Sequence, residues 1–374
     1  MAGVTGLLSV DLHQACKLCL LNDGKGVCGL PGSTYPESAG RWCPSTEVHE
    51  PSLAADHTFD ITTDSGASDA FFDAASDELI YRDDTDTWFK KHGQVFRPMT
   101  YVQVQGEAKQ FMQLQVATGG FLGPTRSLLS KSKIDNLLTL SRHHFRIDPH
   151  LLDECRNLIG CADGTVLDLD TQTLVSQTTA PVTKMVRCSF HPNSDCMEFK
   201  RFLGQVFAEN HSVLSFVQRA IGYSLSGFTD EQCLFFLVGK GSNGKTTLLN
   251  TIQYVFSDYG ATTPAQTLLV SRNGNQQTND LAKLVGIRFV TASETEQGER
   301  LAESKLKRIT GGDRINCRGL YEEFFEYDPQ FKLWLATNDS PKFSGGDYAT
   351  ESTLSSFLSP STRLIAITAC KPAY

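Results

Sequence analysis

The sequence predicts an α/β protein in which a parallel sheet with flanking helices surrounds a phosphate-binding loop, preceded by a mainly helical region. Two observations predict the sheet. A glycine-rich segment at 239–246 lies between a short apolar run and an apolar stripe of helical period. Two later apolar runs, at 287–293 and 332–337, each end in polar residues, as expected of buried strands at the carboxyl edge of a parallel sheet.

The segment 239–246 reads Gly-Lys-Gly-Ser-Asn-Gly-Lys-Thr and satisfies the pattern G-x-x-x-x-G-K-[ST]. Its glycines let backbone N–H groups close around phosphate oxygens, and the following helix adds its positive dipole end. Lys245 then reaches the β- and γ-phosphates of ATP, and the Thr246 hydroxyl binds Mg²⁺. The predicted nucleotide-binding residues are Gly239, Lys240, Gly241, Ser242, Asn243, Gly244, Lys245, Thr246 and Thr247.

Two glutamates and one asparagine follow the later strands and complete a predicted catalytic set with Lys245. An ATPase of this type needs a carboxylate at the end of a neighbouring strand, and Glu294 and Glu296 follow the run 287–293. We assign Glu294 to Mg²⁺, although either glutamate fits the role of the base that polarises water. Asn338 ends the run 332–337, where a polar group senses the γ-phosphate. The alternatives are two solvated acids and an ordinary turn asparagine.

The composition bounds the class of protein. The chain has 374 residues, 40% hydrophobic and 20% charged, as in soluble globular proteins. It shows no apolar run of membrane-spanning length and no signal-peptide pattern, so we expect a cytoplasmic protein with no membrane partner. The net charge of -8 argues against a basic coat but leaves room for a locally basic groove.

Four cysteines lie in a Gly-, Pro- and Ser-rich leader at 1–56: Cys16, Cys19, Cys28 and Cys43. Their thiolates have the number needed for tetrahedral Zn²⁺, but the second pair is spread more widely than in most zinc ribbons. Zinc binding and unligated thiols therefore both stay open.

The remaining elements are expected from hydrophobic period and turn residues. After weak mixed structure at 57–100, they are helices within 108–116 and 134–140, a hairpin at 163–173, helices at 199–207 and 213–225, and a helix at 301–309. Two further strands are expected at 314–320 and 324–327, around a tip at 321–323.

Several motifs in the same order resemble the superfamily 3 helicases of phage and plasmid primase–helicases. They are the loop 239–246, the acidic motif 293–296, Lys305, Thr310-Gly311-Gly312-Asp313, Arg318, Leu320-Tyr321, Phe324, Phe331-Lys332-Leu333 and Ala336-Thr337-Asn338. Asp163–Leu169 is similar to the helper region that precedes the ATPase in satellite-phage and poxvirus-type members. The resemblance implies an AAA+-like sheet and a chain divided into a leader (1–56), a helper domain (57–227), an ATPase core (228–349) and a divergent tail (350–374).

The resemblance also implies a mechanism. Its members form rings, usually hexamers, with ATP between subunits, and a β-hairpin tracks single-stranded DNA in the channel. Here that hairpin is 314–327: Arg314 and Arg318 meet phosphates, Tyr321 stacks on a base, and Lys305 faces nucleotide or DNA. The alternative is a surface hairpin with solvated charges.

The resemblance ends at Ala349. Members continue with an arginine pair and an apolar strand, whereas 350–374 is rich in Ser and Thr and has Arg363 as its one arginine. We therefore expect a frameshift or truncation, and no primase activity from so short a leader. The predicted function is an ATP-dependent DNA helicase of viral, prophage or plasmid replication. The alternatives are a truncated remnant that binds nucleotide and DNA, a protein-remodelling ATPase and, least favoured, a small-molecule kinase.

Overall fold

A computed structural model describes residues 59–118, 127–239, 243–269, 279–292, 300–319, 324–338, 342–343 and 363–368. The leader cysteines, for which zinc or unligated thiols were predicted, lie outside the described residues. Within the described ranges no three His, Cys, Asp or Glu side chains gather as a metal site would require. No helix in these ranges has the length and apolar character needed to cross a bilayer.

The chain forms two compact units. The first contains Cys155–Val175 and the residues from Met185 onward, and the second contains the described residues up to Glu154 together with Ser176–Lys184. The predicted boundary between helper and ATPase, at 227/228, therefore falls inside the first unit. The helical segments Met197–Val206 and His211–Leu225 pack in one core cluster with strands of the sheet that precede and follow the predicted P-loop.

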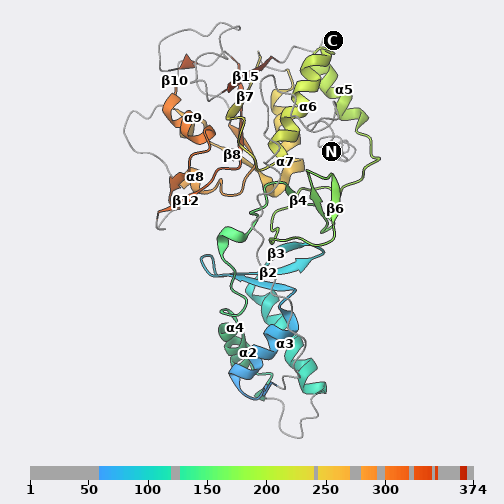
Figure 1. The fold of residues 1–374 in the computed structure, drawn as a ribbon, viewed down its shortest axis with the longest axis vertical. Helices are drawn as coiled ribbons and strands as arrows, with labels where there is room; N and C mark the ends of the chain where they lie inside the picture. Colours follow the sequence, from blue (N-terminus) through green and yellow to red (C-terminus); the bar gives the residue numbers. More distant parts are fainter. Residues whose placement is uncertain are drawn as a thin grey trace, which may run out of the picture. The chain divides into compact units, whose positions relative to one another are not determined.

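The first unit is built on a parallel sheet with strand order β15-β7-β13-β9-β8 (Figure 1). The strands are β7 (Cys233–Val238), β8 (Gly260–Thr263), β9 (Phe289–Ala292), β13 (Lys332–Thr337) and β15 (Arg363–Thr368). Strand β13 pairs with β7 on one side and with β9 on the other, so the strands that precede the P-loop, the acidic motif and Asn338 are neighbours. The predicted α/β fold class is confirmed.

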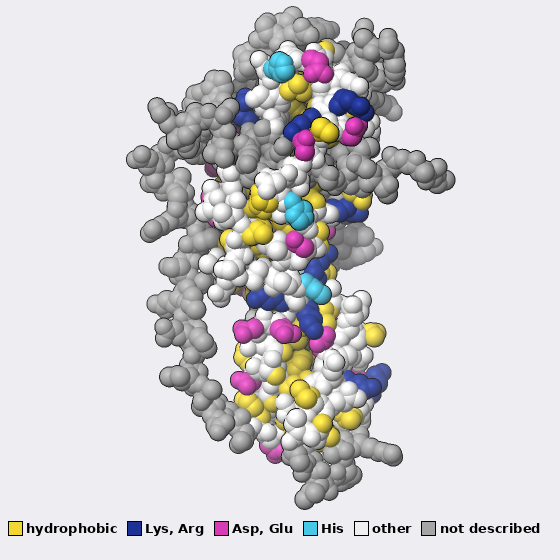
Figure 2. All heavy atoms as spheres, turned by 90° about the vertical axis from the view of Figure 1, so that its right-hand side faces the viewer, with side chains coloured by type: hydrophobic (Ala, Val, Ile, Leu, Met, Phe, Trp, Pro, Cys, Tyr) yellow, Lys and Arg dark blue, Asp and Glu magenta, His cyan; other side chains and the backbone are white. Residues whose placement is uncertain are grey.

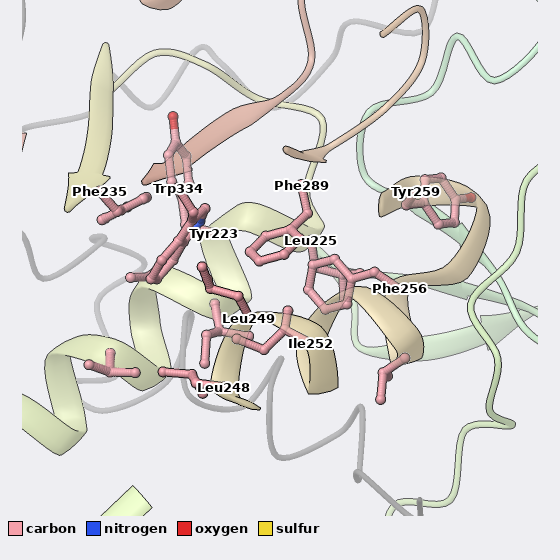
Figure 3. Packing of buried hydrophobic residues seen from close by; sticks show 14 of the residues in the cluster. Tyr223, Leu225, Phe235, Leu248, Leu249, Ile252, Phe256, Tyr259, Phe289 and Trp334 are labelled. Atoms are coloured by element: carbon pink, nitrogen blue, oxygen red, sulfur yellow. The ribbon is translucent and has the colours of Figure 1, made fainter. Parts of the chain in front are cut away.

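Helices cover both faces of this sheet (Figure 1). The helices of one face are α5 (Met197–Val206), α6 (His211–Leu225) and α7 (Lys245–Phe256), and those of the other are α8 (Asn279–Ala282) and α9 (Glu303–Thr310). The side chains alternate accordingly: Phe235 of β7 packs on the α7 side and Phe236 on the α9 side. Figure 3 shows the first of these clusters, with Leu249 and Ile252 of α7 close to Phe289 of β9.

Two buried cations lie at the amino edge of the sheet. Lys332, the first residue of β13, is 2% exposed, and Arg288, just before β9, is 1% exposed. Lys332 Nζ donates to the carbonyl oxygens of Ser226, Phe228 (2.9 Å) and Gln330 (3.1 Å). The guanidinium of Arg288 donates to the carbonyls of Leu225 and Cys155, at 3.1 and 3.2 Å. Both cations thus bind the carboxyl end of α6, where helix carbonyls lack helical donors.

Strand β15 corrects one expectation. The tail was expected to lack the family's apolar strand, but Arg363–Thr368 pairs in parallel with β7 along its whole length. The run Leu364-Ile365-Ala366-Ile367 is short but rich in aliphatic and β-branched residues, which favour a strand at a sheet edge.

Smaller elements complete the first unit. They are the antiparallel sheet β4 (Leu158–Gly160), β5 (Val166–Asp168) and β6 (Thr173–Val175); the 3₁₀ turns η3 (Ser257–Tyr259) and η4 (Ala265–Leu268); the pair β10 (Arg300–Leu301) and β14 (Lys342–Phe343); and the hairpin β11 (Ile315–Cys317) and β12 (Phe325–Tyr327). The hairpins predicted at 163–173 and 314–327 are both present.

The second unit packs helices on an antiparallel sheet. Its elements are α2 (Asp64–Ala75), β1 (Leu79–Arg82), β2 (Thr87–His92), β3 (Val95–Met99), α3 (Tyr101–Thr118), α4 (Lys131–Ser141) and η2 (Pro149–Leu151). Thr63 and Ser130 cap α2 and α4 by accepting from backbone N–H groups, the usual role of hydroxyls at helix starts. Phe71, Trp88 and Phe145 form part of its core. On the face drawn in Figure 2, acidic and basic side chains are mixed.

Candidate nucleotide-binding site

Glycine 244 begins the site. It is the N-cap of α7 and has φ of 80°, in the left-handed region that only glycine adopts readily. The next residue, Lys245, starts the helix and is 5% exposed, whereas the side chains of Thr246 and Thr247 are exposed. The predicted sequence of strand, glycine turn and helix is therefore present, with backbone N–H groups at the start of α7.

The Lys245 ammonium contacts Asn338. Its Nζ donates to Asn338 Oδ1 at 3.3 Å, to Asn243 Oδ1 at 3.0 Å and to the carbonyl oxygen of Gly239. Asn338 follows β13 directly, and β13 pairs with β7, so the contact joins the ends of two neighbouring strands. These partners are neutral oxygens. A phosphate offers Lys245 anionic oxygens instead, which form stronger charge-assisted hydrogen bonds.

Five of the residues predicted for nucleotide binding and catalysis lie outside the described residues. They are Lys240, Gly241 and Ser242 of the loop and the two glutamates Glu294 and Glu296. The strand before the acidic segment is described: β9 ends at Ala292, which pairs with Leu335 of β13. The chain therefore leaves β9 at the edge of the sheet where Asn338 leaves β13.

A polar network ties α7 to the strands beside the site. Gln253 Oε1 of α7 accepts from Thr262 Oγ1 of β8 at 3.0 Å and from Thr291 Oγ1 of β9 at 3.1 Å. The two hydroxyls are 3.0 Å apart. The sequence carries no local signal for this network, since the three residues come from separate elements.

Three of the four predicted DNA-binding residues, Lys305, Arg314 and Arg318, belong to or directly flank elements on the other side of the sheet from α7. Lys305 belongs to α9, and the hairpin β11–β12 packs with α9 in the same cluster. Arg314 Nε pairs with Asp328 Oδ1 at 3.3 Å at the hairpin base, and Arg318 lies over the Phe324 ring, 4.8 Å from its centroid, nearer the tip. Tyr321 is outside the described residues. Burial, followed by the nearby Arg308, lowers the pKa of Lys305, and Asp280 acts in the opposite direction.

Two family models match this chain. Residues 68–208 match a family described as D5 N terminal like, and residues 237–351 match a family of unknown function, DUF5906. The first match ends just after α5, and the second begins at the end of β7 and includes the P-loop and Asn338.

Curated relatives come from large viruses and a virophage. The chain is 28% identical over 213 residues to a protein of Acanthamoeba polyphaga mimivirus named "Putative helicase L207/L206". It is 26% identical over 142 residues to "Putative helicase V13" of Sputnik virophage. These matches cover 54% and 36% of this chain but 22% and 18% of the relatives, so the chain spans less than a quarter of their length.

Among solved structures, the apo C-terminal region of NrS-1 matches 81% of this chain and 61% of its own length, with 9% identity and a TM-score of 0.41. The family matches and viral relatives confirm the resemblance inferred from the motifs. The fold and site define an α/β protein with a P-loop sequence motif, and residues 68–208 are similar to the family described as D5 N terminal like. Within that class, the chain is similar to the superfamily 3 primase–helicase-type proteins of viruses.

Proposed function

We propose that this chain provides the ATPase of a superfamily 3 DNA helicase that acts in viral, prophage or plasmid replication. The observation that carries the proposal is the contact of Lys245 with Asn338 at the carboxyl edge of the sheet. It brings together the phosphate-binding lysine and the strand-end asparagine that the order of motifs had paired.

The residues fit ATP and Mg²⁺ by their donor set. Gly244 exposes backbone N–H groups at the start of α7, Lys245 supplies a cation held by neutral oxygens, and Thr246 supplies an exposed hydroxyl. Bound ATP supplies the phosphoryl group that passes to water. Lys245 holds its β- and γ-oxygens, and Asn338 orients the γ-phosphate. Thr246 and Glu294 bind Mg²⁺, and Glu296 or Glu294 polarises the water.

The DNA partner rests on the relatives and the hairpin. The viral relatives are named as helicases, and the chain shares only part of their length, so the activity of the whole protein is part of the proposal. We assign DNA contact to Arg318, Tyr321 and Lys305 ahead of Arg314, because Asp328 already pairs with Arg314. Assembly into a ring, usually a hexamer, follows from the same resemblance.

The test is the rate of ATP hydrolysis by the purified chain with and without single-stranded DNA. Lys245→Ala should lower the rate at least about a hundredfold, the usual effect of removing a group that stabilises the transferring phosphoryl. Asn338→Ala should lower kcat while leaving ADP affinity nearly unchanged. Lys200→Ala, on an exposed residue of α5 paired with Asp195, is the matched control and should keep the wild-type rate. DNA-independent hydrolysis with no DNA affinity would exclude a helicase and favour a protein remodeller.

A second candidate is a remnant that binds nucleotide and DNA without efficient turnover. The observation that favours it is the tail, where Arg363 is the one arginine of 350–374. An arginine finger typically contributes about 10³–10⁵ in rate. ADP binding that is lost in Lys245→Ala, together with no measurable hydrolysis in wild type, would support this candidate.

A further inference from the structure

We propose that helix α5 is a positioning element for the phosphate-binding loop, in which Val206 and Phe202 hold Gly244 and thereby set nucleotide affinity. The proposal deepens the proposed function, because it rests on the nucleotide site at Lys245. It concerns residues 38 and 42 positions before Gly244, in the segment that matches the D5 N-terminal family.

Side chains of α5 leave no room for a Cβ atom at Gly244. A Cβ placed on this glycine would lie 2.7 Å from Val206 Cγ2 and 3.4 and 3.5 Å from two ring atoms of Phe202. These three are the nearest atoms outside its own neighbours. Gly244 therefore needs to be glycine for two independent reasons: its positive φ and the helix that lies directly against it.

Helix α5 is itself held in place by packing in the core, so its contact with Gly244 does not relax easily. Val206 is 3% exposed and belongs to the cluster that includes Leu203, Leu248 and Leu249. The same cluster therefore holds α5 against the first turns of α7. Because protein interiors are close-packed, the methyl groups of Val206 have little room to move and limit the positions that Gly244 can take.

The physical consequence concerns binding. A phosphate site works when its N–H groups are held within about 0.5 Å of the bound geometry. Glycine has the largest backbone conformational freedom of any residue. The contact with Val206 restricts that freedom before binding and so reduces the entropy lost when phosphate is bound. Truncating Val206 should weaken nucleotide binding even though no α5 side chain needs to touch the ligand.

The experiment compares two truncations on α5. Val206→Ala removes the methyl groups beside Gly244, and Leu203→Ala removes more buried volume from the same helix and cluster. Both should lower Tm. Val206→Ala should weaken the Kd for ADP·Mg²⁺ about tenfold, since small displacements of a site cost at least this much. Leu203→Ala should keep the wild-type Kd within about twofold, because the atoms that lie against Gly244 belong to Val206 and Phe202 and not to Leu203.

Phe202→Leu provides a second variant if Val206→Ala does not fold. Phe202 is only partly buried, so its truncation should be tolerated, and it should weaken ADP binding in the same direction by a smaller factor. The change in hydrogen exchange when ADP is added, compared within each variant, adds a readout of coupling between α5 and the nucleotide site. Because linkage is reciprocal, ADP should slow exchange of the α5 amides in wild type more than in Val206→Ala.

The possible outcomes distinguish a failure of the positioning role from a failure of the proposed function. Equal Kd values for wild type and Val206→Ala, or equal weakening in Val206→Ala and Leu203→Ala, would overturn the positioning role alone. Tight ADP binding without hydrolysis, with the expected split between the two variants, would support the positioning role and overturn the helicase. A wild-type protein that binds no ADP would overturn both.

Discussion

Two lysines stand at opposite edges of the same sheet. Lys245 lies at the carboxyl edge and Lys332 at the amino edge, and both are almost fully buried. Each ammonium group donates to neighbouring oxygens. The partners differ in kind: those of Lys245 include the side-chain amides of Asn243 and Asn338, whereas those of Lys332 are the main-chain carbonyls around the end of α6.

The difference separates a binding lysine from a structural one. Carbonyls at the end of α6 are fixed by the helix, and the Tyr223 ring 4.8 Å from Lys332 Nζ adds a cation–π contact. An incoming anion has no oxygen to displace there without unfolding the helix end. At the carboxyl edge the amide side chains can rotate away, so a phosphate can replace them.

The largest loss of stability is expected from a substitution at the amino edge of the sheet. Lys332→Met should lower the free energy of unfolding by about 3 kcal/mol, because the carbonyl oxygens of Ser226, Phe228 and Gln330 lose their donor. Urea denaturation followed by circular dichroism measures the change. Lys200→Met, on an exposed lysine, should change stability by less than about 0.5 kcal/mol. A Lys332 variant as stable as this control would contradict the structural role.

The same substitution at Lys245, at the carboxyl edge, should affect stability less and nucleotide binding strongly. Lys245→Met should lower the free energy of unfolding by about 1 kcal/mol, less than Lys332→Met, because two of its three acceptors are side-chain amides that can turn to other donors or to water, and the Gly239 carbonyl is its one main-chain acceptor among them. It should nevertheless abolish nucleotide-dependent stabilisation, seen as the loss of the rise in Tm with ADP·Mg²⁺. Similar losses of stability at both lysines would remove the distinction between the edges.

A third lysine gives the smallest effect. Burial lowers the pKa of Lys305 on α9 below its ordinary 10.5. Between the folded and unfolded pKa values the unfolded chain binds more protons, so this group makes stability rise with pH, up to about pH 10.5. Lys305→Met should remove that contribution. The difference in denaturation midpoint between variant and wild type should shrink as pH approaches 10.5, and a difference that stays constant would argue against it.

Much of the sheet and part of the site were predictable. The apolar run 233–238 before a glycine-rich loop can only be a buried strand of modest length, and 332–337 repeats the pattern. Asn338 could be placed near Lys245 because parallel strands end at one edge. The role of Lys332 could not be predicted, because a lysine at the start of an apolar strand is usually exposed, and two of its carbonyl partners, Ser226 and Phe228, lie 106 and 104 residues earlier in the chain.

The contact of α5 with the loop was also beyond sequence reasoning. Val206 and Phe202 read as ordinary members of an amphipathic helix, and only the packing of α5 onto α7 shows what they face. Strand β15 was missed because its apolar run is short and lies in a segment rich in Ser and Thr. Pairing with β7, a strand buried along most of its length, decides its structure.

The path of the chain between the two units limits how the protein can be divided. Within the described residues it leaves the second unit after Glu154, returns at Ser176 and leaves again after Lys184. The returning segment is bonded to the second unit: Phe96 N–H donates to the Val182 carbonyl at 2.8 Å, and Thr183 N–H donates to Asp153 Oδ1 at 2.7 Å. A gene segment that ends at codon 154 would leave the Phe96 N–H without its acceptor, and one that begins at codon 155 would leave the Thr183 N–H without its acceptor. Neither cut at this boundary therefore preserves the hydrogen bonds that complete the second unit.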